Sequence, residues 1–144
     1  MEIMQKSTGE VRHFSIFIPT NTPSLKNSKV WTGRRLIPSK TVREYIKSSD
    51  KDYEENKEKW FKMIEGKNKP YFVGFHFYRK SKHKFDFINA CQIVQDLMVQ
   101  HGWIEDDNMD ELIPVCIYYK DEHGKHGYTY DKENPGVEIT ILDI

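Results

Sequence analysis

The stretch FDFINACQIVQDLMVQHGWIEDDNMDELIP, residues 85–114, decides how the centre of this chain folds. Its apolar residues recur at the spacing of one helix face, which predicts a helix from Ala90 to about His101. Asn89 is a residue type that caps helix starts, and Gly102 suits the position just after a helix end. The apolar face consists of Ala90, Ile93, Val94, Leu97 and Met98.

Acidic residues flank this predicted helix at both ends. Asp86 precedes it at the end of a strand-like run, and Asp106 and Asp107 follow the turn that ends it. Folding the unit back on itself would bring the single aspartate and the acidic pair to the same end. Carboxylates beside a basic segment, here Arg79 to Lys84, suit a magnesium ion that activates water against a phosphodiester. The other interpretation, which spacing alone favours, is a strand end followed by a solvated acidic turn.

The rest of the chain predicts strands and helices around this unit. Ser39 is suited to cap a helix, which we expect to be interrupted over Ser48 to Asp52. A second helix is predicted from Tyr53 to Glu65. We expect loops over Thr20 to Pro38 and over Lys120 to Pro135, the second of them polar and mobile. Runs of β-forming residues predict strands from Val11 to Pro19, Tyr71 to Tyr78, Leu112 to Tyr119 and Gly136 to Leu142. This order predicts an α+β fold, with a small mixed β-sheet and helices packed on one side, in a single domain over residues 1–144.

Composition indicates a soluble protein in a reducing compartment. The 144 residues are 38% hydrophobic and 31% charged, and they contain no apolar run of about 18 residues. The first residues lack the apolar stretch of a signal peptide. The two cysteines, Cys91 and Cys116, have apolar neighbours, which favours buried reduced thiols over a disulfide. We therefore expect a cytoplasmic protein without membrane contact.

Charge is balanced over the whole chain but segregated along it. Lysine plus arginine and aspartate plus glutamate number 22 each, so only local patches can select a charged partner. Two basic segments supply candidate phosphate contacts, with solvated surface charges as the alternative. Trp31 lies in the first segment and could stack on an unpaired base, although an ordinary packing role is favoured. The candidate DNA-binding residues are Lys26, Arg34, Arg35, Lys40, Arg79, Lys80, Lys82 and Lys84.

Taken together, these features resemble the RusA family of Holliday junction resolvases. The specific part runs from Asp86 through Asn89, Asp96 and Gly102 to Asp107, in the order and spacing of that family. Further similarity lies in a loop and in the C-terminal strand, so that the resemblance covers nearly the whole chain. These supporting residues are Ile18, Pro19, Pro23, Ser24, Asn27 and the run 135–138.

The resemblance implies a homodimer, encoded by a bacterium, phage or prophage, that binds four-way DNA junctions. It further implies symmetric cleavage of the junction with Mg²⁺ or Mn²⁺. Asp86 and Asp107 match the catalytic, metal-binding aspartates, and Asp106 is the nearest additional metal ligand. Asn89, Gln92 and Asp96 would support the site, although Asp96 is equally well explained as a solvated acid on a helix face.

Two positions depart from the family pattern. Ile88 stands where the family has a second aspartate, and Gln92 stands where it has a lysine. Isoleucine cannot bind a metal, and glutamine brings no positive charge. The first hypothesis is therefore a metal-dependent endonuclease with fewer carboxylates, and the second is a protein that binds junctions without cutting them. The third hypothesis is a structural or regulatory protein that makes no DNA contact.

Overall fold

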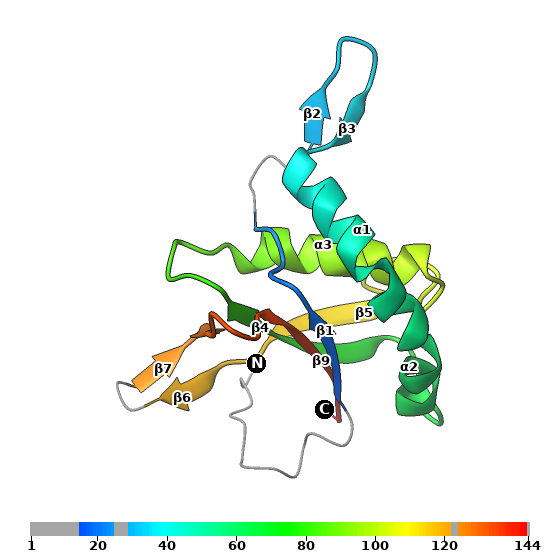
Figure 1. The fold of residues 1–144 in the computed structure, drawn as a ribbon. Helices are drawn as coiled ribbons and strands as arrows, with labels where there is room; N and C mark the ends of the chain where they lie inside the picture. Colours follow the sequence, from blue (N-terminus) through cyan, green and yellow to red (C-terminus); the bar gives the residue numbers. More distant parts are fainter. Residues whose placement is uncertain (1–14, 25–28, 122–123, 144) are drawn as a thin grey trace.

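A five-stranded mixed sheet forms the centre of the protein (Figure 1). The structure is a computed structural model, and it describes residues 15–24, 29–121 and 124–143. Four strands follow the order β1 (Ser15–Pro19), β9 (Gly136–Leu142), β4 (Tyr71–Arg79) and β5 (Leu112–Cys116), and β8 (Tyr128–Tyr130) also pairs with β4. β9 is antiparallel to both β1 and β4, whereas β5 and β8 are parallel to β4. The predicted α+β class and mixed sheet are confirmed.

Helices α1 (Lys40–Glu55), α2 (Lys57–Ile64) and α3 (Phe87–Gln100) pack on the sheet, and α1 and α3 lie together on one side of it (Figure 1). Successive side chains of a strand point to opposite faces of the sheet. Every second side chain therefore enters the core, as Val73, Phe75 and Phe77 do on β4. Parallel neighbours cannot be joined by a tight hairpin. The chain therefore crosses from β4 to β5 through α3, which places the start of α3 near the end of β4.

Most predicted elements are present. β9 has the predicted bounds, and β4 extends the predicted strand by one residue to Arg79. Ser39 caps α1 as expected, because its hydroxyl accepts a hydrogen bond from the Val42 N–H at 3.3 Å. Gly102 has a φ of 77° directly after the α3 C-cap, the left-handed conformation that favours glycine.

Several predicted boundaries are wrong. α1 continues through residues 48–52 and ends at Glu55, with Asn56 as its C-cap, so Tyr53 belongs to α1 and not to the second helix. The expected loop over 20–38 contains a hairpin of β2 (Lys29–Trp31) and β3 (Leu36–Pro38). The expected loop over 120–135 contains β8 and parts of another hairpin, β6 (Tyr119–Asp121) and β7 (Gly124–His126). The expected strand over 112–119 ends at Cys116 as β5. Residues 11–14 of the first predicted strand lie outside the described residues.

Both cysteines carry free thiols. Cys91 is buried, as predicted, and burial raises its pKa to about 12. Cys116 is only half-buried, since it lies at the end of β5. Among the described helices none has both the length and the apolar character needed to cross a membrane.

Candidate functional site

Asp86 starts α3. Its Oδ1 accepts hydrogen bonds from the N–H groups of Ile88 (3.0 Å) and Asn89 (3.3 Å). The prediction that Asn89 caps this helix is therefore wrong, because Asp86 performs that role and the helix begins at Phe87. A carboxylate at this place also interacts favourably with the positive end of the helix dipole. Asp86 thus has a structural role in addition to any role in metal binding.

The segment after α3 is fixed to the body by two tryptophans. The Trp60 Nε1–H donates to the Trp103 carbonyl at 2.9 Å, and the Trp103 Nε1–H donates to the Tyr53 carbonyl at 3.0 Å. Both indole rings are buried, and they stack with their centroids 5.6 Å apart. These contacts tie the chain at Trp103 to both α1 and α2. They therefore fix the position in space at which the acidic segment after Trp103 starts.

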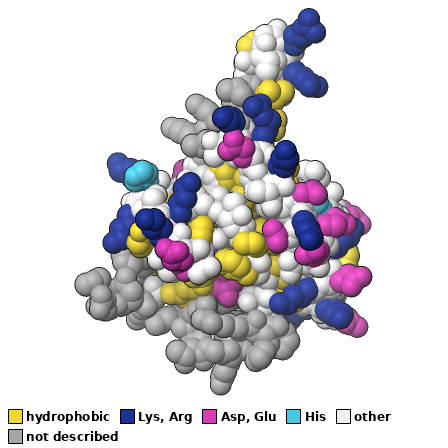
Figure 2. All heavy atoms as spheres, viewed as in Figure 1, with side chains coloured by type: hydrophobic (Ala, Val, Ile, Leu, Met, Phe, Trp, Pro, Cys, Tyr) yellow, Lys and Arg dark blue, Asp and Glu magenta, His cyan; other side chains and the backbone are white. Residues whose placement is uncertain are grey.

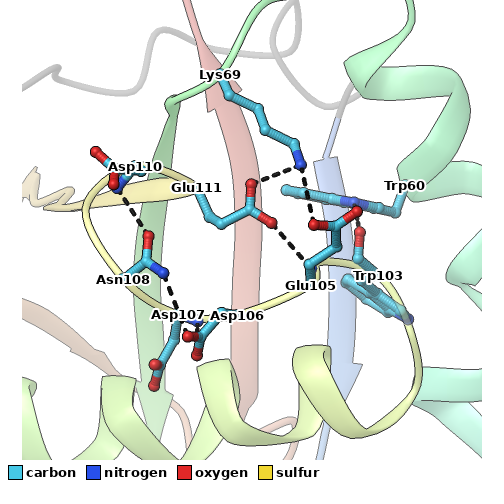
Figure 3. Close-up of polar contacts among 9 residues, drawn as sticks. All are labelled: Trp60, Lys69, Trp103, Glu105, Asp106, Asp107, Asn108, Asp110 and Glu111. Atoms are coloured by element: carbon cyan, nitrogen blue, oxygen red, sulfur yellow. Dashed lines mark hydrogen bonds and ion pairs between the residues drawn. The ribbon is translucent and has the colours of Figure 1, made fainter.

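Glu111 holds the other end of the acidic segment. Figure 3 shows Lys69 reaching Glu111 and Glu105, with Nζ to carboxylate distances of 2.6 Å and 4.0 Å. The buried Glu111 carboxylate also accepts from the Glu105 N–H at 3.2 Å. Its carboxylate raises the pKa of Lys69. An acid that the sequence presents as part of a solvated block is therefore a structural residue.

Asp106 shapes the turn between these two anchors. Its Oδ1 accepts from the Asp107 N–H at 2.8 Å, and its Oδ2 accepts from the Asn108 amide at 3.2 Å (Figure 3). These hydrogen bonds favour the charged carboxylate, so they lower the pKa of Asp106. Both of its oxygens serve the turn, which leaves Asp107 as the acid of the pair that faces α3.

Gln92 joins Asp107 to α3. Its Nε2 donates to Asp107 Oδ2 at 2.8 Å and to Asp96 Oδ1 at 2.7 Å. A glutamine amide carries two N–H donors, and both are used here on carboxylates. The predicted fold-back is thus present at Asp107, but its partner acid is Asp96. The sequence could have predicted the contact between Gln92 and Asp96, because residues four apart on a helix are neighbours. It held no such pattern for Asp107.

The two positions that depart from the family pattern lie on the same helix stripe. Ile88, Gln92 and Asp96 follow one another at intervals of four residues, and all three are exposed. Ile88 is 75% exposed, so its side chain contributes little to the core. A carboxylate at position 88 would lie one helical turn from the amide that holds Asp96 and Asp107.

The three predicted metal ligands do not assemble as one group. The residues that the structure describes include Asp86, Asp106 and Asp107, and they contain no cluster of three or more histidine, cysteine, aspartate or glutamate side chains suited to a metal ion. Asp106 turns its oxygens into its own loop, and Asp86 caps α3. Asp107 instead shares the Gln92 amide with Asp96, which was predicted only to support the site. Two carboxylates meet the minimum for Mg²⁺, which keeps several waters and takes phosphate oxygens as further ligands.

Arg79 was predicted to contact phosphate, but the structure buries its side chain. It is only 8% exposed, its Nη1 donates to the Thr22 carbonyl, and its Nη2 donates to Ser24 Oγ at 3.5 Å. Its guanidinium also lies 4.5 Å from the centre of the Phe85 ring. Burial lowers the pKa of Arg79. This side chain anchors residues 22–24 to the end of β4, so its role is structural.

The other predicted basic residues that the structure describes are exposed. Lys80, Lys82 and Lys84 follow β4, with Lys82 Nζ 5.2 Å from the centre of the Tyr130 ring. Arg34 and Arg35 lie at the turn of the β2–β3 hairpin, and Lys40 begins α1. Lys26 and Asn27 lie outside the described residues. The packing role favoured for Trp31 is wrong, because this side chain is 65% exposed.

A second polar group lies among the strands and was not predicted. The buried Glu138 on β9 accepts hydrogen bonds from Ser15 Oγ (3.2 Å), Tyr78 OH (3.3 Å) and Tyr119 OH (2.5 Å). Desolvation and the adjacent carboxylate both raise the pKa of Tyr119. This group satisfies a buried charge with hydroxyl donors and ties β9 to β1 and β4, which is a structural role.

Comparisons with known proteins add no family assignment. Neither a search of protein-family models nor a search of curated proteins returned a match to this sequence.

Proposed function

We propose that this protein is a metal-dependent endonuclease that acts on branched DNA. The observation that carries the proposal is the return of Asp107 to α3, where Asp107 and Asp96 share the Gln92 amide. One carboxylate on the exposed face of α3 and one on the turn that follows this helix, with lysines after β4, provide the charges that phosphodiester chemistry requires. The order of these residues along the chain agrees with the resemblance to the RusA family.

Mg²⁺ or Mn²⁺ would be held by Asp107 and Asp96, with Asp86 as a further acid at the start of the same helix. Such an ion supplies an activated water and stabilises charge on the phosphate. Gln92 orients the two carboxylates toward each other by donating to both. Lys80, Lys82 and Lys84 would hold the DNA backbone. The proposal includes a homodimer and a cytoplasmic location, both expected from the sequence.

A second candidate function is junction binding without cleavage. It is favoured by the chemistry of two side chains on α3. Gln92 offers a neutral amide where a catalytic lysine is expected, and the exposed Ile88 offers no ligand where an aspartate is expected. This protein would bind a junction with strong salt dependence and leave every strand intact.

The two candidates separate in a cleavage assay on a synthetic four-way junction with Mg²⁺ or Mn²⁺. Asp107→Asn should abolish cleavage, because the neutral amide oxygen lacks the negative charge with which the carboxylate binds a metal ion. Asp110→Asn is the matched control, since it removes the same charge from an exposed residue of the same turn. Equal loss in both variants would mean that overall charge, and not the Asp107 site, supports activity.

A wild-type protein that folds and binds the junction but makes no nick at any metal concentration would refute the endonuclease proposal. In that case the double variant Ile88→Asp, Gln92→Lys tests whether the residues at these two positions prevent cleavage. Cleavage by the double variant would show that these two positions silence the site. Absence of junction binding by the wild type would instead support the third hypothesis, a protein without DNA contact.

A further inference from the structure

The β2–β3 hairpin stands away from the sheet, beyond the start of α1 (Figure 1). Its strands pair Trp31 with Leu36, and the Thr32 N–H donates to the Arg35 carbonyl at 3.1 Å. Gly33 has a φ of 93° at the first position of the two-residue turn, which is the place where such hairpins favour glycine. The hairpin is therefore a built element with a defined tip.

This arm presents two large apolar side chains to solvent. Trp31 is 65% exposed and Leu36 is 63% exposed, and directly paired residues of antiparallel strands point to the same face. The protein buries its other two tryptophans, Trp60 and Trp103, almost completely. An exposed indole beside an exposed leucine, on an element that projects from the body, is typical of a contact surface.

The positive charge around these side chains favours an anionic partner. Arg34 occupies the turn, Arg35 follows it, and both are exposed. Figure 2 shows basic side chains gathered at the far end of the arm. On α1, Lys40 pairs with Glu44 at 3.9 Å, and Arg43 Nη1 donates to the Pro38 carbonyl at 3.2 Å, which connects the hairpin to the helix. The arm thus combines a flat aromatic ring with one cation in the turn and one directly after it.

We propose that this hairpin binds unpaired nucleotides at the branch point of DNA, with a base stacked on Trp31 and phosphates held by Arg34 and Arg35. The inference rests on the proposed function and extends it to the part of the substrate that the arm contacts. Stacking on an indole requires an open base face, which duplex DNA does not offer within its stack. A sequence-tolerant stack of this kind changes affinity by roughly 5- to 100-fold per base.

The test is a binding measurement without divalent metal, so that cleavage plays no part. Wild type is titrated with a forked DNA that carries 2-aminopurine in its unpaired arm next to the branch, and with a fully paired duplex of the same length. Trp31→Ala should weaken binding to the fork by roughly 5- to 100-fold and change duplex binding little. Trp31→Phe should retain part of the preference. Phe61→Ala is the matched control, because Phe61 is another exposed aromatic, 43% exposed, on α2.

Fluorescence gives an independent readout. Trp60 and Trp103 are shielded from solvent, so quenching of tryptophan emission by the fork should come from Trp31 and vanish in Trp31→Phe. Quenching of the 2-aminopurine on binding should also depend on Trp31. If Trp31→Ala leaves the ratio of fork to duplex affinity unchanged, the inference is wrong even if the protein cleaves junctions.

The remaining outcomes keep the two proposals distinct. Loss of the fork preference in Trp31→Ala, in a protein that never cuts, would support the arm and refute the endonuclease. A shift of Trp31→Ala from dimer to monomer in sedimentation, with the affinity ratio unchanged, would show that the arm contacts a second copy of the chain and would overturn the inference. Absence of DNA binding by wild type would overturn both proposals.

Discussion

Replacing Trp103 by phenylalanine tests the contacts that place the acidic segment. The indole N–H of Trp103 donates to the Tyr53 carbonyl at 3.0 Å, and Tyr53 lies in the last turn of α1. Carbonyls in the last turn of a helix lack partners within the helix. The tryptophan therefore satisfies an acceptor that would otherwise be buried without a hydrogen bond. Phenylalanine keeps an aromatic ring in the pocket but cannot donate.

The expected cost has two parts. The smaller ring gives up roughly 40 Å² of buried apolar area, or about 1 kcal/mol. A buried carbonyl left without its partner adds about 1–2 kcal/mol. The free energy of unfolding should fall by about 2–3 kcal/mol, which corresponds to a decrease of roughly 6 to 12 °C in Tm.

Urea unfolding followed by circular dichroism measures this loss. Trp31→Phe is the matched control, because the same change at a side chain that is 65% exposed should alter stability by less than about 0.5 kcal/mol. A loss below about 1 kcal/mol for Trp103→Phe would refute the assigned hydrogen bond. Equal effects of the two variants would refute the contrast between the buried and the exposed tryptophan.

Three further predictions address charge and titration. Arg79→Met should lower the free energy of unfolding by about 2 kcal/mol in urea unfolding, because it leaves the Thr22 carbonyl unpaired. Arg34→Met should leave stability nearly unchanged, but it should weaken DNA binding and reduce the slope of its salt dependence by about 1. Burial favours the neutral thiol of Cys91 and raises its pKa to about 12. The stability that the native state gains by holding this thiol neutral is complete below the thiol's ordinary pKa and falls as the pH rises toward 12. In the native state Cys91 should resist thiol reagents at pH 8. The turn lowers the pKa of Asp106, so the stability that Asp106→Ala removes should be greatest at neutral pH and shrink as acid protonates the carboxylate, as measured by urea unfolding at several pH values.

The sequence predicts those parts of the fold that local patterns determine. β4 and β9 consist of alternating β-forming residues, and both occur where expected. Ser39 and Gly102 mark helix ends through hydrogen bonding and backbone conformation, which depend on few neighbours. The partners of β4 depend on contacts between distant residues. No local pattern indicates that β9 is antiparallel to β4 while β5 and β8 are parallel to it.

Two helix boundaries were missed for identifiable reasons. The apolar pattern begins at Ala90, but the first turn of α3 includes the exposed Ile88, which the pattern does not count. The serines near residue 49 suggested an interruption of α1. The hydroxyl of the buried Ser49 donates instead to the Tyr45 carbonyl at 2.6 Å, so this serine is satisfied within the helix.

Charge in the sequence also misled where burial decides the role. Arg79 and Glu111 both occur among residues of their own charge, which indicated surface patches. The Arg79 side chain is buried at the end of β4, where it donates to the Thr22 carbonyl. Glu111 pairs with Lys69 and accepts a hydrogen bond from the Glu105 N–H. In the sequence, Arg79 precedes the proposed DNA-binding Lys80, and Glu111 follows the proposed metal ligand Asp107 by four residues. Local composition therefore does not identify which charges face solvent.

Under the proposed function, the differences at positions 88 and 92 from the RusA pattern balance each other in charge on α3. Relative to the family pattern, Ile88 removes one negative charge and Gln92 removes one positive charge, so their combination leaves the net charge of the stripe unchanged. Restoring Ile88→Asp alone would add a carboxylate one turn from Gln92, near Asp96 and Asp107, with no compensating cation. Restoring Gln92→Lys alone would place an ammonium group between those two carboxylates and compete with a metal ion. The two changes should therefore be strongly non-additive in cleavage, with both single variants near or below wild type and only the double variant above it; independent gains from each single change would show that charge balance does not link the two positions.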